Sequence, residues 1–327
     1  MTIILTFLQQ AIRQGIIILF GATGEIITEK SGNLNLGVPG IMYMGGIAGL
    51  MGGFFYENSV AEPNGWVSVL ISFLCAFLCA ALAGLLFCFL TTTLRANQNV
   101  TGLALTTFGV GFGNFFGGSL ANLVGGVGQI SVAHAARAYQ SSIPFLSDHL
   151  GPVGQLLFSY GFMTYLGIIL AIFLTWFLAR TRVGLNLRSV GENPGAADAA
   201  GINVTLYKYL ATTLGAGIAG LGGLYFVMDY SSGTWTNNGL GDRGWLAVAL
   251  VIFALWKPVH AIWGSFVFGG LYLLYLYIPG LGREMQEIFK MFPYIVTIIV
   301  LIFTSLRKRR EDQPPAALGL PYFREER

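Results

Sequence analysis

Stretches of apolar residues long enough to cross a lipid bilayer recur along the whole chain. A helix needs about 20 residues to span the hydrocarbon core. The stretches that approach or exceed this length are residues 8–28, 36–56, 66–94, 100–120, 153–179, 207–228, 244–257, 259–279 and 290–306. Only Lys257 and Pro258 separate the short seventh stretch from the eighth, and because proline ends a helix we read them as a tight turn at the membrane surface. The pattern predicts an all-α, polytopic membrane helical bundle with about nine spans.

The low charge content supports a membrane protein and argues against a nucleic-acid partner. Charged residues make up 10% of the chain, whereas an ordinary soluble domain has about 25%. The net charge of +3 is small, and a basic cluster appears only after the last apolar stretch. We therefore expect lipid, rather than water or nucleic acid, to surround most of the surface.

The basic residues indicate the orientation. Loops on the cytoplasmic side of a membrane carry an excess of lysine and arginine. If the cluster 307–310 is cytoplasmic, the connections around Lys30, Arg95, 180–208 and Lys257 fall on the same side. The remaining basic residues fall outside: Arg13, Arg137, Arg243, Arg283 and Lys290. We expect an external N-terminus, one permease domain over residues 1–310, and a cytoplasmic tail over 311–327.

No catalytic, metal or nucleotide site is evident in the sequence. Cys75, Cys79 and Cys88 lie in one apolar stretch without histidines at ligand spacing. The segment 24–31 resembles a phosphate-binding loop, but Glu29 stands where the second glycine is needed, and a carboxylate would repel phosphate. We expect no catalytic residue, no metal and no cofactor in this chain.

Few ionisable residues lie within the apolar stretches, so ion-driven transport is disfavoured. Coupled transporters usually place such groups deep in the membrane, and here Glu25, Glu29 and Lys30 are the main exceptions. Three kinds of transport protein are then left as interpretations: a channel, a facilitator, or a permease driven by a separate subunit.

Small residues repeat at every fourth position in two of the stretches. This spacing lets helix backbones approach closely in lipid, as static packing or as a sliding interface. The residues are Gly45, Gly49 and Gly53 in one stretch and Gly215, Ala219 and Gly223 in another.

Two polar segments interrupt the apolar pattern. The first, residues 24–40, is rich in glycine and carries Asn33 and Asn35, which could bind a polar solute. It is either a surface loop or irregular backbone buried at membrane depth, which requires protein or a watery cavity around it.

The second polar segment is the long connection 180–207. Within it, Asn193 suits a helix N-cap, Pro194 the first helical position and Gly201 a C-terminal stop. The spacing predicts a short helix on the cytoplasmic surface, either a structural connector or a shape that docks into a groove on a partner.

The stretches GEIITEKSGNLNLGVPGIM and RTRVGLNLRSVGENPGAADAAGINVTLYK resemble two signature stretches of bacterial ABC-importer permeases. They resemble the branched-chain amino acid and simple-sugar group, and most closely its nucleoside-type subgroup. The stretch NQNVTGLA, from Asn97 onwards, is similar to a third family stretch. The resemblance covers about residues 11–306, and the second motif is quite specific.

The resemblance implies a type II importer-like permease in the bacterial cytoplasmic membrane. Its partners would be an ABC ATPase subunit, which holds the ATP and Mg, a second related permease, and an extracytoplasmic solute-binding protein. The short helix would be the coupling helix that seats in the ATPase, with candidate residues Arg188, Glu192, Asn193, Pro194, Asp198 and Gly201.

A nucleoside or simple sugar is the expected solute. Candidate pathway residues are Glu25, Asn33, Asn35, Asn97, Asn99 and Thr101. Pro39 stands where the family commonly has an acidic residue, which places the selectivity for nucleosides in question. The alternative function is a stand-alone channel or facilitator for a small polar solute.

Overall fold

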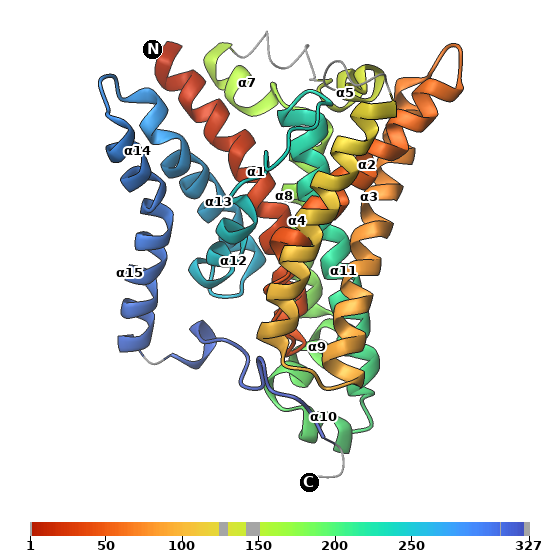
Figure 1. Cartoon of the computed structure of the whole chain (residues 1–327). Helices are drawn as coiled ribbons and strands as arrows, with labels where there is room; N and C mark the ends of the chain where they lie inside the picture. The colour runs from red at the N-terminus through yellow and green to blue at the C-terminus, as the bar shows by residue number, and fades with distance from the viewer. Residues whose placement is uncertain (1, 124–129, 142–150, 308, 324–327) are drawn as a thin grey trace.

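The computed structural model describes residues 2–123, 130–141, 151–307 and 309–323, which form a helical bundle (Figure 1). Within these residues the β-structure consists of one isolated bridge between Ser131 and Thr234, so the predicted all-α class is confirmed. Lys308 and residues 324–327 of the predicted tail lie outside the described residues. The longer helices are α1 (Thr2–Lys30), α2 (Val38–Ser59), α3 (Gly65–Cys88), α4 (Gln98–Leu123), α8 (Phe162–Arg180), α11 (Val204–Tyr225), α13 (Pro258–Leu273) and α15 (Phe292–Arg307).

Shorter elements connect or extend these helices. Two are π-helical turns that continue a long helix, η1 after α3 and η2 after α11. The short elements are η1 (Phe89–Thr93), α5 (Ala133–Tyr139), α7 (Gly151–Phe158), α9 (Arg182–Glu192), α10 (Pro194–Ala199), η2 (Phe226–Tyr230), α12 (Arg243–Phe253), η3 (Leu274–Tyr277), α14 (Arg283–Lys290) and η4 (Arg310–Asp312).

Seven helical segments in the described part of the chain are long and apolar enough to cross a membrane. They are α1, α2, α3 with η1, α8, α11 with η2, α13 with η3, and α14 with α15. The other two predicted spans are also helical but do not meet this standard. α12 is too short, with 11 residues. α4 is long enough, but its apolar residues alternate with glycine, threonine and asparagine, which lower its mean hydropathy.

Helix α11 lies at the centre of the bundle, packed against α1, α2 and α3. Glycine permits this arrangement, since a Cβ on Gly45 of α2 would lie 2.5 Å from the Cα of Gly220 on α11. Gly24 of α1 approaches the backbone of Gly215 in the same way. The close approach predicted from the small residues is confirmed, and any side chain at these positions would force the helices apart.

Helix α3 turns large apolar side chains outward and small ones toward the bundle. On α3, leucines at every fourth position are exposed, from Leu70 at 59% to Leu82 at 64%, whereas Ala76 and Ala80 on the opposite face are fully buried. A water-soluble helix would bury its leucines. The reversed distribution is what a lipid environment favours.

The connection between α1 and α2 is buried irregular backbone, not a surface loop. Asn33 and Asn35 are 0% and 1% exposed. The backbone N–H of Asn35 donates to the carboxylate of Glu25, five residues before α1 ends, at 3.0 Å. Protein groups therefore satisfy this backbone, as membrane depth requires.

A second irregular segment, residues 231–242, leads from η2 to the start of α12. Arg243 fixes its end. The guanidinium donates from Nε to Gln14 Oε1 on α1 at 3.1 Å, and from Nη1 to the carbonyls of Gly239 at 2.9 Å and Leu240 at 3.2 Å. Three aromatic rings surround the guanidinium, with centres at 4.8–5.4 Å: Phe226, Tyr230 and Tyr272.

The two irregular segments meet beside α2. The backbone and ring of Pro39 pack against Gly244, the second residue of α12, and the hydroxyl of Tyr43 accepts from Gly241 N at 3.2 Å. Pro39 is buried and occupies the first turn of α2, where proline is well suited.

Candidate functional site

The predicted short helix is present as α10. The side chain of Asn193 accepts from Ala196 N at 2.9 Å and caps the helix, Pro194 is its first residue, and Gly201 follows it with φ +80. The neighbouring helices are capped in the same manner, α9 by Thr181 and α11 by Asn203. Each cap satisfies helical N–H groups that would otherwise lack acceptors.

These caps allow three helices to follow one another with very short connections. α10 lies at the extreme end of the bundle, opposite the first residues of α1 (Figure 1). Ala197 of α10 packs with Val190 of α9 and Val204 of α11 in a small buried cluster. α10 is therefore held rigidly to α11, the central helix.

The tail after α15 covers part of this end of the bundle (Figure 1). Ala317 N donates to Gly191 O at 3.0 Å, and Gly319 N donates to Gly32 O at 3.1 Å. The ammonium of Lys257 donates to Asp312 at 2.9 Å. This hydrogen bond holds the pKa of the Asp312 carboxyl below its usual range.

Two of the predicted coupling residues contact this tail. Arg310 donates to the Glu192 carboxylate, and the hydroxyl of Tyr322 donates to Asp198 Oδ2 at 2.8 Å. Arg188 is exposed and borders a separate cavity beside Lys30 and Trp256. The exposed surface of α10 is formed by Ala196, Ala199 and Ala200, the last at its C-cap.

The predicted pathway residues separate into two groups. Glu25, Asn33 and Asn35 hold the buried connection: Asn33 Nδ2 donates to Thr212 on α11 at 2.9 Å, and Asn35 Oδ1 accepts from Gly37 N at 2.9 Å. Asn33 Oδ1 and Asn35 Nδ2 find no partner among the described residues.

The second group lies at the start of α4. Asn97 Oδ1 accepts from Val100 N at 3.1 Å, and the Thr101 hydroxyl donates to Asn97 O at 2.8 Å. Asn97 and Asn99 are exposed and border a cavity of about 220 Å³. Leu34 N donates to Gln98 Oε1 at 2.6 Å, so the two groups are neighbours.

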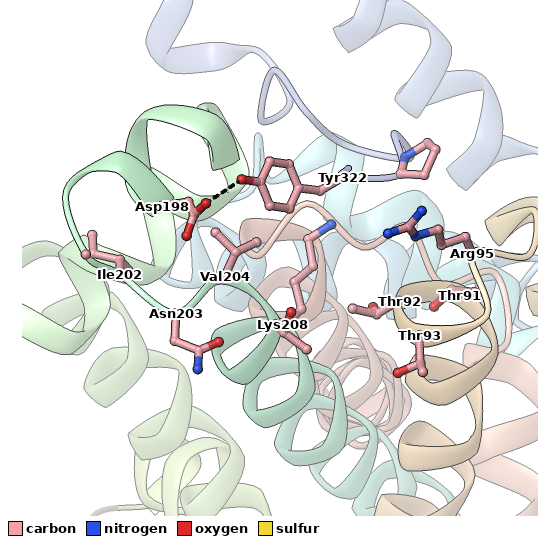
Figure 2. Close-up of a pocket in the computed structure, with 13 residues that line it drawn as sticks. Thr91, Thr92, Thr93, Arg95, Asp198, Ile202, Asn203, Val204, Lys208 and Tyr322 are labelled. Atoms are coloured by element: carbon pink, nitrogen blue, oxygen red, sulfur yellow. Dashed lines mark hydrogen bonds between the residues drawn. The ribbon is translucent and has the colours of Figure 1, made fainter. Parts of the chain in front are cut away.

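A cavity of about 480 Å³ opens beside α10 (Figure 2). Its walls come from the π-helical turn η1, from Arg95 two residues after η1, from the end of α10 and the start of α11, and from the tail residues Pro321 and Tyr322. Figure 2 shows Lys208 reaching from α11 toward the space between Tyr322 and Arg95.

Sequence reasoning did not find this cavity or the docked tail. Lys208 closes the second signature stretch, but its burial depends on η1, which is 115 or more residues away in the chain. The tail residues are likewise joined to partners far away in the chain, and no local periodicity marks such contacts.

The chain was compared with known proteins. Residues 7–301 match the family described as branched-chain amino acid transport system / permease component. The chain is 30% identical to the putative glucose ABC transporter permease protein TsgC13 of Haloferax volcanii, covering 97% of each chain. It is 31% identical to the nucleoside ABC transporter permease protein NupC of Lactococcus lactis over 87% of each chain.

A third relative is the guanosine ABC transporter permease protein NupQ of Bacillus subtilis, 29% identical over 95% of this chain and 94% of the relative. No solved structure matches. The family match covers nearly all of the helical bundle, and the resemblance noted in the signature stretches is confirmed. The chain belongs to the branched-chain amino acid transport system permease family and is a multi-pass ABC transporter permease.

Proposed function

We propose that this chain is the membrane subunit of an ABC importer that carries nucleosides or simple sugars into a bacterial cell. ATP would be hydrolysed in a separate ATPase subunit that binds α10, and an extracytoplasmic binding protein would deliver the solute. The observation that carries the proposal is the short, capped helix at the end of the bundle, joined rigidly to α11.

The attachments of α10 support a coupling role. A force on α10 reaches α11 through the contact of Ala197 with Val204. α11 in turn touches α1 and α2 through glycine, with no side chain to deform between the backbones. The ATPase shifts the permease between two states by binding α10 differently in each state, since equal binding would shift nothing.

We propose that the α10 end is cytoplasmic and the N-terminus external, with residues 1–310 as the permease domain and 311–327 as a cytoplasmic tail. The positive-inside rule supports this orientation, because Lys30, Arg95, Arg188 and Lys257 belong to the α10 end. In this type II importer-like arrangement, α4 and the segment 231–253 also cross the membrane, which gives nine crossings in all, about what the sequence predicts.

We further propose that the outward face of α4 meets a second, related permease and lines the solute path. α4 is less apolar than a lipid-facing helix. Thr107 is exposed, and Gly111 and Gly118 have no neighbouring atom within 4 Å of a Cβ. Small residues of this kind suit close approach of another helix in the membrane.

Uncharged polar groups on this side suit an uncharged polar solute. Asn97 and Asn99 stand exposed at one end of α4, and amides hydrogen-bond the hydroxyls and bases of nucleosides and sugars. The names of the relatives, which include nucleoside and glucose permeases, support the same solute classes.

Substitution of Ala196 by tryptophan tests the coupling role. The side chain is exposed on α10, so Ala196→Trp leaves the bundle intact but obstructs a groove that fits α10. In vesicles with all partner subunits, we expect ATP-dependent uptake to fall at least tenfold. Ala61→Trp, at the opposite end of the bundle, is the matched control and should transport normally.

Normal uptake and ATP hydrolysis with Ala196→Trp would remove the support for the coupling role. The alternative, a stand-alone channel or facilitator, predicts solute flux in vesicles that contain this chain alone. Such flux without ATP or partners would replace the importer by that alternative.

A further inference from the structure

The cavity beside α10 (Figure 2) contains a buried cation without a matching anion. Lys208 is 3% exposed. Its ammonium forms no hydrogen bond with the other described residues and belongs to none of the ion pairs among them. The ammonium points into the cavity (Figure 2), and a charge so largely shielded from bulk water is unfavourable unless an anion or several acceptors face it.

A second cation faces the same space. Arg95 follows η1 with φ +59, a left-handed conformation that bulky residues rarely adopt. Its guanidinium stacks on the ring of Phe323 with a centre distance of 4.4 Å. The tail therefore orients this arginine at the mouth of the cavity.

Neutral polar groups complete the lining. The first turn of α11 borders the cavity at Val204 and Thr205. Asn203 caps the N–H of Leu206, whereas the N–H groups of Val204 and Thr205 have no acceptor within the helix. η1 brings Thr91, Thr92 and Thr93 to the opposite wall (Figure 2), with their hydroxyls already hydrogen-bonded within the protein.

One carboxylate also lies on the wall. Asp198 accepts the hydroxyl of Tyr322 at 2.8 Å. Among the described residues that line the cavity, Asp198 is the one carboxylate and Lys208 and Arg95 are the two cations, so this lining is positive on balance. Helix N-termini and paired cations are the common means of binding phosphate.

We propose that this cavity binds the phosphate group of a small anionic molecule, with Lys208 as the principal contact and Arg95 as the second. The volume of about 480 Å³ admits a phosphate with an attached sugar or nucleoside. The ligand would touch α10, α11 and the tail together, so its binding would bear directly on the surface proposed to meet the ATPase. Access from the cytoplasm depends on the orientation proposed above, but binding itself does not.

The test is a titration of the purified full chain in nanodiscs of neutral lipid. The probes are inorganic phosphate, uridine monophosphate, and uridine as the uncharged control. We expect both phosphates to bind, and Lys208→Met to weaken their binding about tenfold or more, because a charge-assisted hydrogen bond is lost. Binding of uridine should not depend on Lys208.

Further variants separate charge from folding. Lys208→Arg keeps the charge and should retain binding. Arg95→Asn, at an exposed position where asparagine tolerates the left-handed backbone, should weaken binding without any risk to the fold. Arg182→Met removes an exposed arginine of α9 outside the cavity and should leave binding unchanged.

Nanodiscs that contain phosphatidylglycerol distinguish the source of the phosphate. If a lipid headgroup is the ligand, this lipid will be retained by the wild type and lost from Lys208→Met, while the soluble phosphates will not bind. Unchanged binding of all three phosphates by Lys208→Met and Arg95→Asn would overturn the proposal. A carboxylate of the ATPase bound to Lys208 in the assembled complex would also overturn it.

Discussion

The contact of Gln14 with Arg243 predicts that the effect of substituting Gln14 depends on whether Arg243 is present. Gln14 is fully buried on α1. Its Oε1 accepts from Arg243 Nε at 3.1 Å, but its Nε2 has no partner among the described residues. The side-chain amide of Gln14 thus accepts one hydrogen bond from a charged group and has one buried N–H donor group without a partner among the described residues.

Gln14→Leu removes both features in the wild type. Loss of a hydrogen bond to a charged group costs about 1.5–3 kcal/mol, and removal of an unsatisfied buried donor returns about 1–3 kcal/mol. The two nearly cancel, so we expect a change in unfolding free energy within about 1 kcal/mol.

In an Arg243→Met background, Gln14 is left without any partner. Gln14→Leu should then stabilise the protein by about 1–3 kcal/mol. The carbonyls of Gly239 and Leu240 lose their donor in both Arg243→Met proteins, so their cost cancels in the double-mutant cycle.

The cycle is measured by unfolding of the four proteins in mixed micelles with increasing SDS. We expect a coupling of at least about 1 kcal/mol, between the average of about 0.6 kcal/mol and the maximum of about 1.7 kcal/mol measured for hydrogen bonds in membranes. Equal effects of Gln14→Leu in the two backgrounds would refute the assignment of Arg243 as the anchor of residues 231–242.

Three further predictions concern packing, assembly and the tail. Gly45→Val places side-chain atoms against the backbone of α11 and should prevent stable folding, which would be seen as loss of monodisperse protein in size-exclusion chromatography. The side chain of Gly111→Leu meets open space, so this variant should fold normally but fail to co-purify with the second permease. The pKa of Asp312 is lowered, so its pair with Lys257 stabilises tail docking above the ordinary carboxyl pKa, and this stabilisation is lost as pH falls through the lowered pKa. Because the pair is partly exposed, the loss should be under about 1 kcal/mol of docking free energy. At that pH an acid-active protease should cleave the tail faster, and Asp312→Asn should abolish this pH dependence. Tyr322→Phe keeps the ring but removes the hydroxyl that donates to Asp198. Loss of a hydrogen bond worth about 1 kcal/mol should raise the hydrogen-exchange rate of the tail about fivefold. An unchanged rate would show that the hydroxyl does not stabilise the docked tail.

Local signals in the sequence were enough to predict the helices and α10. Apolar stretches identify the long helices because a helix that crosses the hydrocarbon core needs about 20 apolar residues in succession. Asn193, Pro194 and Gly201 mark α10 because capping and turning depend on a few adjacent residues. Small-residue spacing likewise predicted close backbone approach at these residues, because such approach depends on the absence of side chains, but it did not say that α2 and α11 are the partners.

Features that depend on distant contacts were not predictable in this way. The sequence left open whether residues 24–40 form a surface loop, because burial of Asn33 depends on Thr212 of another helix. The seventh apolar stretch did not reveal that α12 is preceded by irregular backbone held by Arg243. The tail carries no periodic pattern, and its place follows from single contacts such as that of Tyr322 with Asp198.

The π-helical turn η1 has a consequence for how chain length can vary in this region. A π-helical turn holds one residue more than an α-helical turn, so deletion of one residue within 89–93 could be absorbed by conversion of η1 to α-helix. α3 would keep its packing upstream, and the residues that follow would keep their orientation, because the wider turn holds the extra residue without passing its rotation on to them. Such a deletion variant would insert into the membrane normally and change only the wall that η1 forms, which separates the architecture of the bundle from the chemistry of one wall.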